Sequence, residues 1–327
     1  MSSDLKARII NLVKPDLEKV EVALEENLDP NLDLVRNIAS HLLFSGGKRL
    51  RPLLLIHSAR LCGYEAGREI EFSTIFEYLH AATLLHDDVV DGADLRRGRP
   101  AAHTKWEAPQ VVLTGDFLLA RALNLAARTR KPDLISVIAR ITQEMSQGEI
   151  DQLSWKGSTE LTEAQYLKII ERKTAVLIEG ATRSGAILAD ADADTETALK
   201  DFGYHIGMAF QMADDLLDYT ATAEQLGKNP GADMREGKLT LPLLYAMDQA
   251  DANEREWMCA AMGDTEFDPE KFESLKEKLV RLGGLKYTQY RAQYHVDRAK
   301  ACLDRFPDND SKTLLNLIAD YSIARKV

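Results

Sequence analysis

The chain has 327 residues, 45% of them hydrophobic, and a formal net charge of −11 at pH 7. The acidic balance argues against binding to nucleic acid, because phosphate backbones need a basic surface. No apolar run approaches the roughly 18 residues of a transmembrane helix, and the first residues show no signal peptide. Cys62, Cys259 and Cys302 are widely spaced, which is typical of free thiols in a reducing compartment. We therefore expect a cytoplasmic protein whose residues 1–327 form one domain.

Apolar residues recur every three or four positions along almost the whole chain, which predicts an all-α fold. No segment shows the alternation that is typical of a strand. The pattern predicts a first helix from near Pro15 to Leu28, a polar loop over residues 221–237 and four shorter helices after it. Between the first helix and the loop, it predicts helices over residues 31–44, 51–61, 66–91, 111–127, 133–148, 162–188 and 195–219.

Two features of the long helices indicate how they begin and pack. Thr162 and Gln165 have the spacing of a capping box at the start of helix 162–188. Gly203 and Gly207 lie inside helix 195–219, where a glycine costs up to about 1 kcal/mol relative to alanine. We therefore expect close contact with a neighbouring helix at these two glycines.

Three carboxylates crowd the end of helix 66–91. Asp87, Asp88 and Asp91 precede Gly92, a residue type that is common just past a helix end. The carboxyl end of a helix already carries partial negative charge, so these side chains repel one another and the helix dipole. A divalent metal that prefers oxygen ligands would relieve the repulsion. For this cluster alone, a solvated acidic helix end is an equally good interpretation.

The same pattern recurs at the end of helix 195–219, where DDLLD matches the DDVVD of the first cluster. Asp214, Asp215 and Asp218, with Gln211, have the spacing of one helix face. If the two helix ends face each other across a cavity, cations must lie between them. The recurrence therefore favours a metal site over two solvated helix ends.

Basic residues cluster near both acidic helix ends despite the negative net charge. Arginine and lysine bind phosphate oxygens, so these residues fit an anionic small molecule better than a polymer. A solvated surface charge is the alternative for each of them. His80 lies seven residues before Asp87 on the same helix face, and a histidine there, taken alone, is more often a core residue than a ligand. The basic residues in question are Lys48, Arg49, Arg51, Arg96, Arg97, Lys173, Lys228 and Lys238.

Six motifs in order along the chain resemble the trans-isoprenyl diphosphate synthase family, also called polyprenyl synthetases, and within it the long-chain octaprenyl and polyprenyl diphosphate synthases. One DDxxD motif alone would be weak, since terpene cyclases share it, but the ordered set covers nearly the whole chain. The motifs are GGKRLRP, LLHDDVVD followed by RRGRP, GD at Gly115 and Asp116, RKT at 172–174, FQMADDLLD, and GKNPGADMREGKLTLPL.

The resemblance implies an all-α bundle around a deep central cavity, usually in a homodimer, that condenses isopentenyl diphosphate onto an allylic diphosphate. Isopentenyl diphosphate would be bound by Lys48, Arg51, His80 and Arg97. The allylic diphosphate would be bound by Arg96, Lys173, Thr174, Gln211, Lys228 and Lys238. Mg²⁺, about three ions per site, would be bound by Asp87, Asp91 and Asp214. The catalytic set would comprise Lys173, Asp87, Asp88, Asp91, Asp214, Asp215 and Asp218.

The helix of the first cluster also bears on product length. Ala82 and Thr83 lie five and four positions before Asp87, about one helical turn deeper. In the family, bulky aromatic residues at these positions give short products, and small residues allow long ones. Two small residues here predict a long-chain all-trans polyprenyl diphosphate of about C35–C50, used for quinone side chains, with a floor formed by deeper residues such as Leu79, Phe76 and Ile75.

Three alternatives remain at this stage. A short-chain synthase that makes farnesyl or geranylgeranyl diphosphate is the nearest. A terpene cyclase would not need the GGKRLRP motif or Arg97, which serve a second diphosphate. A non-catalytic subunit of a heteromeric synthase would be expected to have lost an acidic cluster, and both are intact. Release of an apolar product could also involve transient contact with a membrane.

Overall fold

The structure is a computed structural model that describes residues 2–28, 32–92, 94–96, 98–222, 230–262 and 269–324. Its fold is all-α, as the sequence predicts. The helices are α1 (Ser2–Leu28), α2 (Asp33–Leu43), α3 (Leu50–Leu61), α4 (Glu69–Asp91), η1 (Ala102–Thr104), α5 (Ala108–Arg128), α6 (Pro132–Trp155), α7 (Glu163–Ile170), η2 (Glu171–Ala175), α8 (Val176–Leu188), α9 (Ala193–Thr220), α11 (Ala232–Arg235), α12 (Leu241–Gln249), α13 (Ala252–Ala261), α14 (Pro269–Arg281), α15 (Gly284–Cys302) and α16 (Asp310–Ala324).

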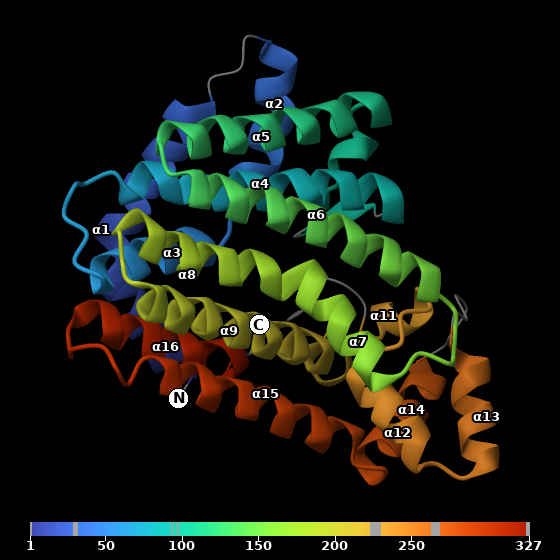
Figure 1. The fold of residues 1–327 in the computed structure, drawn as a ribbon. Coiled ribbons are helices and arrows are strands. Elements are labelled where there is room, and N and C mark those ends of the chain that lie inside the picture. Colours follow the sequence, from blue (N-terminus) through green and yellow to red (C-terminus); the bar gives the residue numbers. More distant parts are fainter. Residues whose placement is uncertain are drawn as a thin grey trace.

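Helices α8 and α9 run through the middle of the bundle, between α4 and α6 on one side and α15 on the other (Figure 1). Helix α5 packs on α4, and α3 packs on both α4 and α8. The short helices α12, α13 and α14 gather at one end beside α7. No helix among the described residues is long and apolar enough to cross a membrane.

Buried apolar side chains form two groups along this bundle. The larger group lies among α1 to α6, α8, α9 and α16 and includes Leu54, Phe76 and Phe202. The smaller group joins α7 and the carboxyl-terminal half of α9 to α12, α14 and α15, and it includes Tyr166 and Met212. The end of α4 comes close to the chain after residue 230 through the ion pair between Asp91 and Lys238. The end of α9 does so through the hydrogen bond from the backbone N–H of Asp233 to Asp218.

Several boundaries differ from the sequence prediction. Helix α1 begins at Ser2 rather than near Pro15. Pro15 lacks the N–H that would donate to a carbonyl one turn earlier, but it lies on the exposed side of the helix, where water can donate to that carbonyl instead. Helix α6 continues seven residues past the predicted end at Gly148. Beyond residue 240 the described chain holds five helices rather than four, since Asp251 caps α13 directly after α12.

A two-residue antiparallel ribbon was not predicted, because strands this short show no alternation. It pairs β1 (Leu95–Arg96) with β2 (Arg99–Pro100). The predicted polar loop after residue 221 likewise contains the one-turn helix α11.

The predicted helix 162–188 begins with the expected capping box of Thr162 and Gln165, but a turn of π-helix interrupts it at η2. Glycines on both sides allow this wider turn to pack closely. A Cβ on Gly148 of α6 would lie 2.8 Å from the backbone nitrogen of Lys173, and one on Gly207 of α9 would lie 2.4 Å from the Cα of Ala175. The close packing predicted at Gly203 and Gly207 is confirmed, and it positions the π-turn, a feature that is frequent at functional sites.

Candidate active site

The first acidic cluster occupies the last turn of α4, which ends at Gly92 with the left-handed backbone conformation expected there. Asp87 and Asp91 are half-buried on one face of the helix. Burial raises the pKa of Asp87 to about 6; Lys173 opposes the rise, and Glu149 and Asp91 add to it. Negative charge is therefore crowded around Asp87, as the sequence indicates.

Asp88, the middle aspartate, has a different environment. Its side chain is only 1% exposed, and Oδ1 accepts a hydrogen bond from Nε of Arg96 at 2.7 Å and lies 2.5 Å from Nη2 of the same residue. Arg96 belongs to β1, and the ribbon is joined to α2 through a 2.8 Å contact between Nε2 of His41 and the carbonyl oxygen of Pro100. The structure thus brings the predicted diphosphate ligand Arg96 next to the first cluster.

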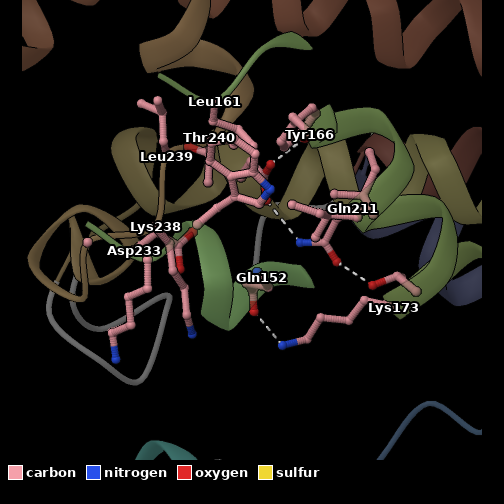
Figure 2. Close-up of a pocket in the computed structure, with 16 residues that line it drawn as sticks. Gln152, Leu161, Tyr166, Lys173, Gln211, Asp233, Lys238, Leu239 and Thr240 are labelled. Atoms are coloured by element: carbon pink, nitrogen blue, oxygen red, sulfur yellow. Dashed lines mark hydrogen bonds between the residues drawn. The ribbon is translucent and has the colours of Figure 1, made fainter. Parts of the chain in front are cut away.

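The second cluster lies in the last two turns of α9. Asp215 is 2% exposed and accepts hydrogen bonds from the Tyr166 hydroxyl at 2.5 Å and from Nε2 of Gln211 at 2.9 Å (Figure 2). Burial, and then the charge of Asp233, raise the pKa of Asp215 well above its ordinary value. Thr174 of the π-turn donates to Oε1 of Gln211 at 2.8 Å. Three predicted residues, Thr174, Gln211 and Asp215, therefore form one hydrogen-bonded chain.

The other two aspartates of this cluster differ in exposure. Asp214 is half-buried. Asp218 is buried, and its Oδ2 accepts the backbone N–H of Asp233 at 3.1 Å, while its carbonyl oxygen accepts the N–H of Gly231 at 2.8 Å. Asp218 therefore positions the segment that leads to Lys238.

Two lysines connect the clusters. The ammonium of Lys173 lies 2.5 Å from Oε2 of Glu149 and donates to Oε1 of Gln152 at 2.6 Å. Lys238 lies 2.7 Å from Glu236 and 3.6 Å from Asp91. Burial opposes the charge of Lys238, but Glu236 and then Asp91 outweigh it and raise the pKa to about 12.

A cavity opens between these side chains and brings together residues of α6, α7, η2, α9 and the chain before α12 (Figure 2). Its polar lining includes Lys173, Lys238, Gln211 and Asp215, and its apolar lining comes from residues such as Leu161. Among the residues that the structure describes, no three His, Cys, Asp or Glu side chains converge to hold a metal by themselves. A metal bound here would need further oxygen ligands from a substrate or water.

The predicted residues for the second diphosphate are less closely assembled. Lys48 is exposed, with its ammonium 5.0 Å from the ring centre of Tyr321. Arg51 and His80 are half-buried on α3 and α4. Arg97 and Lys228 lie outside the described residues.

The sequence places Arg49 in a basic cluster for an anionic ligand, and the structure corrects this. It is 4% exposed and forms ion pairs with Glu21 at 2.6 Å and Glu77 at 2.8 Å. Its guanidinium also donates to the carbonyl oxygen of Leu43. Arg49 therefore joins α1, α2 and α4 internally, whereas its neighbour Lys48 faces solvent.

Four side chains of the site were not predicted from the sequence: Gln152 and Tyr166 line the cavity, and Glu149 and Glu236 pair with its lysines. Glu149 and Gln152 were overlooked because the helix was ended at Gly148, although their i, i+3 spacing places them on one face of α6. Tyr166 is the buried partner of Asp215, and its position among apolar residues of α7 concealed a polar role. Glu236 lies in a segment that was interpreted as a loop.

The bundle is all-α and has an acidic cluster at the end of α4 and another at the end of α9. Lys173 and Lys238 line the cavity beside α9, and Arg96 pairs with Asp88 of α4. This arrangement is typical of one class of enzyme, the prenyltransferases that act on diphosphates. The sequence profile described as Polyprenyl synthetase matches residues 32–279. The chain belongs to this family and is a trans-prenyl synthase.

Individual relatives agree over nearly the full length. The octaprenyl diphosphate synthase of Escherichia coli strain K12 is 35% identical over 97% of this chain and 98% of its own. The crystal structure of a polyprenyl synthase from Caulobacter crescentus CB15, complexed with calcium and isoprenyl diphosphate, superposes with a TM-score of 0.92 at 40% identity and covers 98% of both chains. The geranylgeranyl diphosphate synthase of Methanosarcina mazei is 32% identical over 97% of this chain and 98% of its own.

Proposed function

We propose that this chain is a long-chain all-trans polyprenyl diphosphate synthase that adds isopentenyl diphosphate units to an allylic diphosphate until the product reaches about C35–C50. The observation that carries this proposal is the small, buried side chain of Ala82, 4% exposed, one turn below Asp87 on α4. Thr83 beside it is half-buried, and its hydroxyl donates to the carbonyl oxygen of His80 within the helix. Neither residue is bulky enough to close a tunnel below the site.

The donor set fits Mg²⁺. Asp87 and Asp91 offer partly exposed carboxylate oxygens one turn apart, and a cation would relieve the crowding of charge that raises the pKa of Asp87. We assign Asp87, Asp91 and Asp214 as the residues that would hold Mg²⁺, about three ions per site, with phosphate oxygens completing the shells. When bound, Mg²⁺ supplies charge neutralisation for the leaving diphosphate.

The chain's own residues then act on two diphosphates. Lys48, Arg51, His80 and Arg97 would orient isopentenyl diphosphate, which makes attack on the allylic carbon effectively intramolecular. Cleavage of the allylic carbon–oxygen bond adds negative charge to the departing diphosphate, and fixed donors around it stabilise that charge. We assign these donors as Lys173, Thr174, Gln211 and Lys238, which line the cavity. Arg96 and Lys228 complete the assignment.

The remaining steps need no side-chain base. The double bond of isopentenyl diphosphate attacks the allylic cation, a carbon–carbon bond forms, and a proton leaves the new cation. The departed diphosphate is the acceptor we propose, because the carboxylates near it would be engaged by cations. The growing apolar chain would extend along the inner face of α4 past Ala82 towards Leu79, Phe76 and Ile75, all buried.

We further propose that residues 1–327 act as one domain in a cytoplasmic homodimer, with transient membrane contact during product release. A component of a two-subunit enzyme is the alternative supported by a relative. The heptaprenyl diphosphate synthase component 2 of Geobacillus stearothermophilus is 36% identical over 97% of this chain and 98% of its own.

One experiment separates these possibilities. The purified chain is incubated with Mg²⁺, farnesyl diphosphate and labelled isopentenyl diphosphate, and the extracted products are sized. Products of about C35–C50 support the proposal. Products that stop at C20 identify a short-chain synthase, and the absence of any product from the chain alone favours a heteromeric enzyme.

A further inference from the structure

The middle aspartate of each acidic cluster is more deeply buried than the one before it. Asp88 is 1% exposed and Asp215 is 2% exposed, whereas Asp87 and Asp214 are half-buried. Adjacent residues on an α-helix point about 100° apart, so neighbouring carboxylates with the same chemistry meet different surroundings. This difference indicates that the members of each pair have different roles.

Asp88 contacts one edge of the Arg96 guanidinium. Its Oδ1 lies 2.7 Å from Nε and 2.5 Å from Nη2, and Oδ2 has no hydrogen-bond partner among the described residues. A guanidinium carries five donors in a rigid fork, so donors remain for a second anion after this contact. The Arg96 side chain is 30% exposed, which leaves it accessible to a ligand.

The backbone around Arg96 gives little support of its own. Strand β1 has two residues, and in the part of the chain that the structure describes it pairs with no strand other than the two-residue β2. Isolated two-stranded ribbons are marginally stable in water, and an unrestrained arginine loses about 2 kcal/mol of side-chain entropy when it is fixed. The buried carboxylate of Asp88 therefore supplies the main restraint on the direction of the guanidinium.

Asp215 has the corresponding relationship to Gln211. It accepts one N–H of the Gln211 amide at 2.9 Å, and the Tyr166 hydroxyl fixes its other oxygen at 2.5 Å. Thr174 occupies the carbonyl oxygen of the same amide at 2.8 Å. An amide nitrogen carries two donors, so one N–H of Gln211 remains for a ligand in the cavity.

We propose that Asp88 and Asp215 are positioning residues: Asp88 orients Arg96 and Asp215 orients Gln211 toward the allylic diphosphate, whereas metal contacts fall to Asp87, Asp91 and Asp214. The proposal rests on the function proposed above, because it needs a diphosphate bound between the ends of α4 and α9. Tyr166 belongs to this arrangement, since it fixes Asp215 from α7.

The first test compares Asp88→Asn, Arg96→Gln and the double variant. We expect Asp88→Asn to raise KM for farnesyl diphosphate and to weaken binding of inorganic diphosphate in calorimetry by roughly 10- to 100-fold, since it weakens a charge-assisted hydrogen bond. KM for isopentenyl diphosphate and the Mg²⁺ concentration for half-maximal rate should stay unchanged. In the Arg96→Gln background, Asp88→Asn should have no further effect, because its role acts through Arg96.

The matched control is Asp94→Asn, which removes the same charge from an exposed side chain between α4 and β1 and should leave all these quantities unchanged. Two outcomes would overturn the proposal for Asp88: a changed Mg²⁺ requirement with an unchanged KM for farnesyl diphosphate, or equal losses with and without Arg96. If the proposed function is wrong, the wild-type protein will form no product. The positioning role is tested separately, because calorimetry measures binding of inorganic diphosphate and needs no turnover.

Tyr166→Phe is the second test and does not depend on the stability of the Asp88 variants. It keeps the ring in the core and removes only the hydroxyl that fixes Asp215. We expect KM for farnesyl diphosphate to rise about three- to tenfold, with KM for isopentenyl diphosphate unchanged. A lower melting temperature with both KM values unchanged would show a purely structural role and overturn the proposal for Asp215.

Discussion

The ammonium of Lys173 lies 2.5 Å from the carboxylate of Glu149, and the charges of both act on Asp87. The lysine expected to stabilise the leaving diphosphate is thus paired with a carboxylate of α6. Burial raises the pKa of Asp87 to about 6, and the charge of Glu149 contributes to this rise. Glu149 therefore influences both a predicted metal ligand and a predicted diphosphate ligand.

Glu149→Gln should extend activity to lower pH. The ionised form of Asp87, which a metal needs, is lost as the pH falls through about 6. Removing the charge of Glu149 lowers this pKa, so more Asp87 remains ionised in acid. We expect the rate at pH 5.5, relative to that at pH 7.5, to rise about two- to threefold over wild type.

The measurement is a pH profile of the Mg²⁺-dependent condensation rate, with Glu160→Gln as the control because that side chain is exposed. An acidic limb that stays in place, or moves to higher pH, would contradict the role assigned to Glu149.

Asp87→Ala should abolish condensation, by about 1,000-fold or more, without unfolding the protein. A carboxyl group with a raised pKa costs stability whenever the pH lies above that pKa, because its ionised form is disfavoured in the fold. The variant should therefore melt at the same temperature as wild type or higher at pH 7.5. Product formation and thermal melting are measured on one preparation, and an active variant would refute the metal assignment.

Local patterns in the sequence predicted much of the fold. The capping box at Thr162 and the end of α4 at Gly92 depend on neighbours along one helix, so spacing alone reveals them. The close packing at Gly203 and Gly207 is a contact with η2 and α8, but the two glycines indicate it by residue type, because a glycine inside a helix needs a compensating contact. The same reasoning predicted a helix end at Gly148 that is wrong, since α6 continues to Trp155. Gly148 resembles a helix end but serves a close contact with the π-turn, a partner more than twenty residues away.

The different surroundings of adjacent residues in the site could not be predicted from the sequence, because they depend on tertiary contacts. Asp87 and Asp88 are chemically identical neighbours, and only the position of Arg96 separates them. Lys48 and Arg49 are likewise adjacent cations, yet Arg49 is enclosed by Glu21 and Glu77. A pattern identifies which residue types gather near a site, whereas helix rotation decides which side chains enter it.

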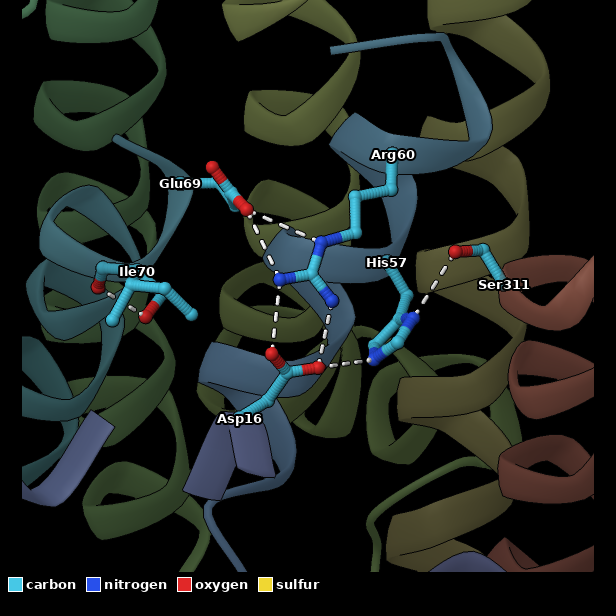
Figure 3. A network of polar contacts seen from close by, with 7 residues as sticks. Asp16, His57, Arg60, Glu69, Ile70 and Ser311 are labelled. Atoms are coloured by element: carbon cyan, nitrogen blue, oxygen red, sulfur yellow. Dashed lines mark hydrogen bonds and ion pairs between the residues drawn. The ribbon is translucent and has the colours of Figure 1, made fainter. Parts of the chain in front are cut away.

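A buried network away from the cavity joins α1, α3, α4 and α16 (Figure 3). Asp16 accepts from Arg60 at 2.7 Å and lies 3.3 Å from Nε2 of His57, whose Nδ1 lies 3.1 Å from the Ser311 hydroxyl. Arg60 also pairs with Glu69 at 3.1 Å. Burial opposes ionisation of Asp16, but hydrogen bonds from His57 and Arg60 outweigh it and hold the pKa below its ordinary value.

Asp16→Asn should destabilise the protein by about 3 kcal/mol at pH 7, because it leaves Arg60 partly unpaired in a buried site. A depressed pKa contributes stability above the unfolded value of about 3.9, and this stability is lost as the pH falls below it. The difference from wild type should therefore shrink in acid. Urea unfolding at pH 7 and pH 3.5 checks this.

Glu18→Gln is the control for Asp16→Asn, since Glu18 is exposed on the same helix. A difference between Asp16→Asn and wild type that stays constant between the two pH values would contradict the electrostatic explanation.

We propose that α4 both carries two of the three metal ligands, Asp87 and Asp91, and forms the wall that limits product length. Product sizing of Ala82→Phe beside wild type tests it most directly. The new ring lies about one turn below Asp87 and should block the growing chain, at a stability cost of about 1–3 kcal/mol for overpacking. We expect a shorter product with metal-dependent turnover still measurable, whereas a folded, active variant that makes a product of unchanged length would rule out this role of α4.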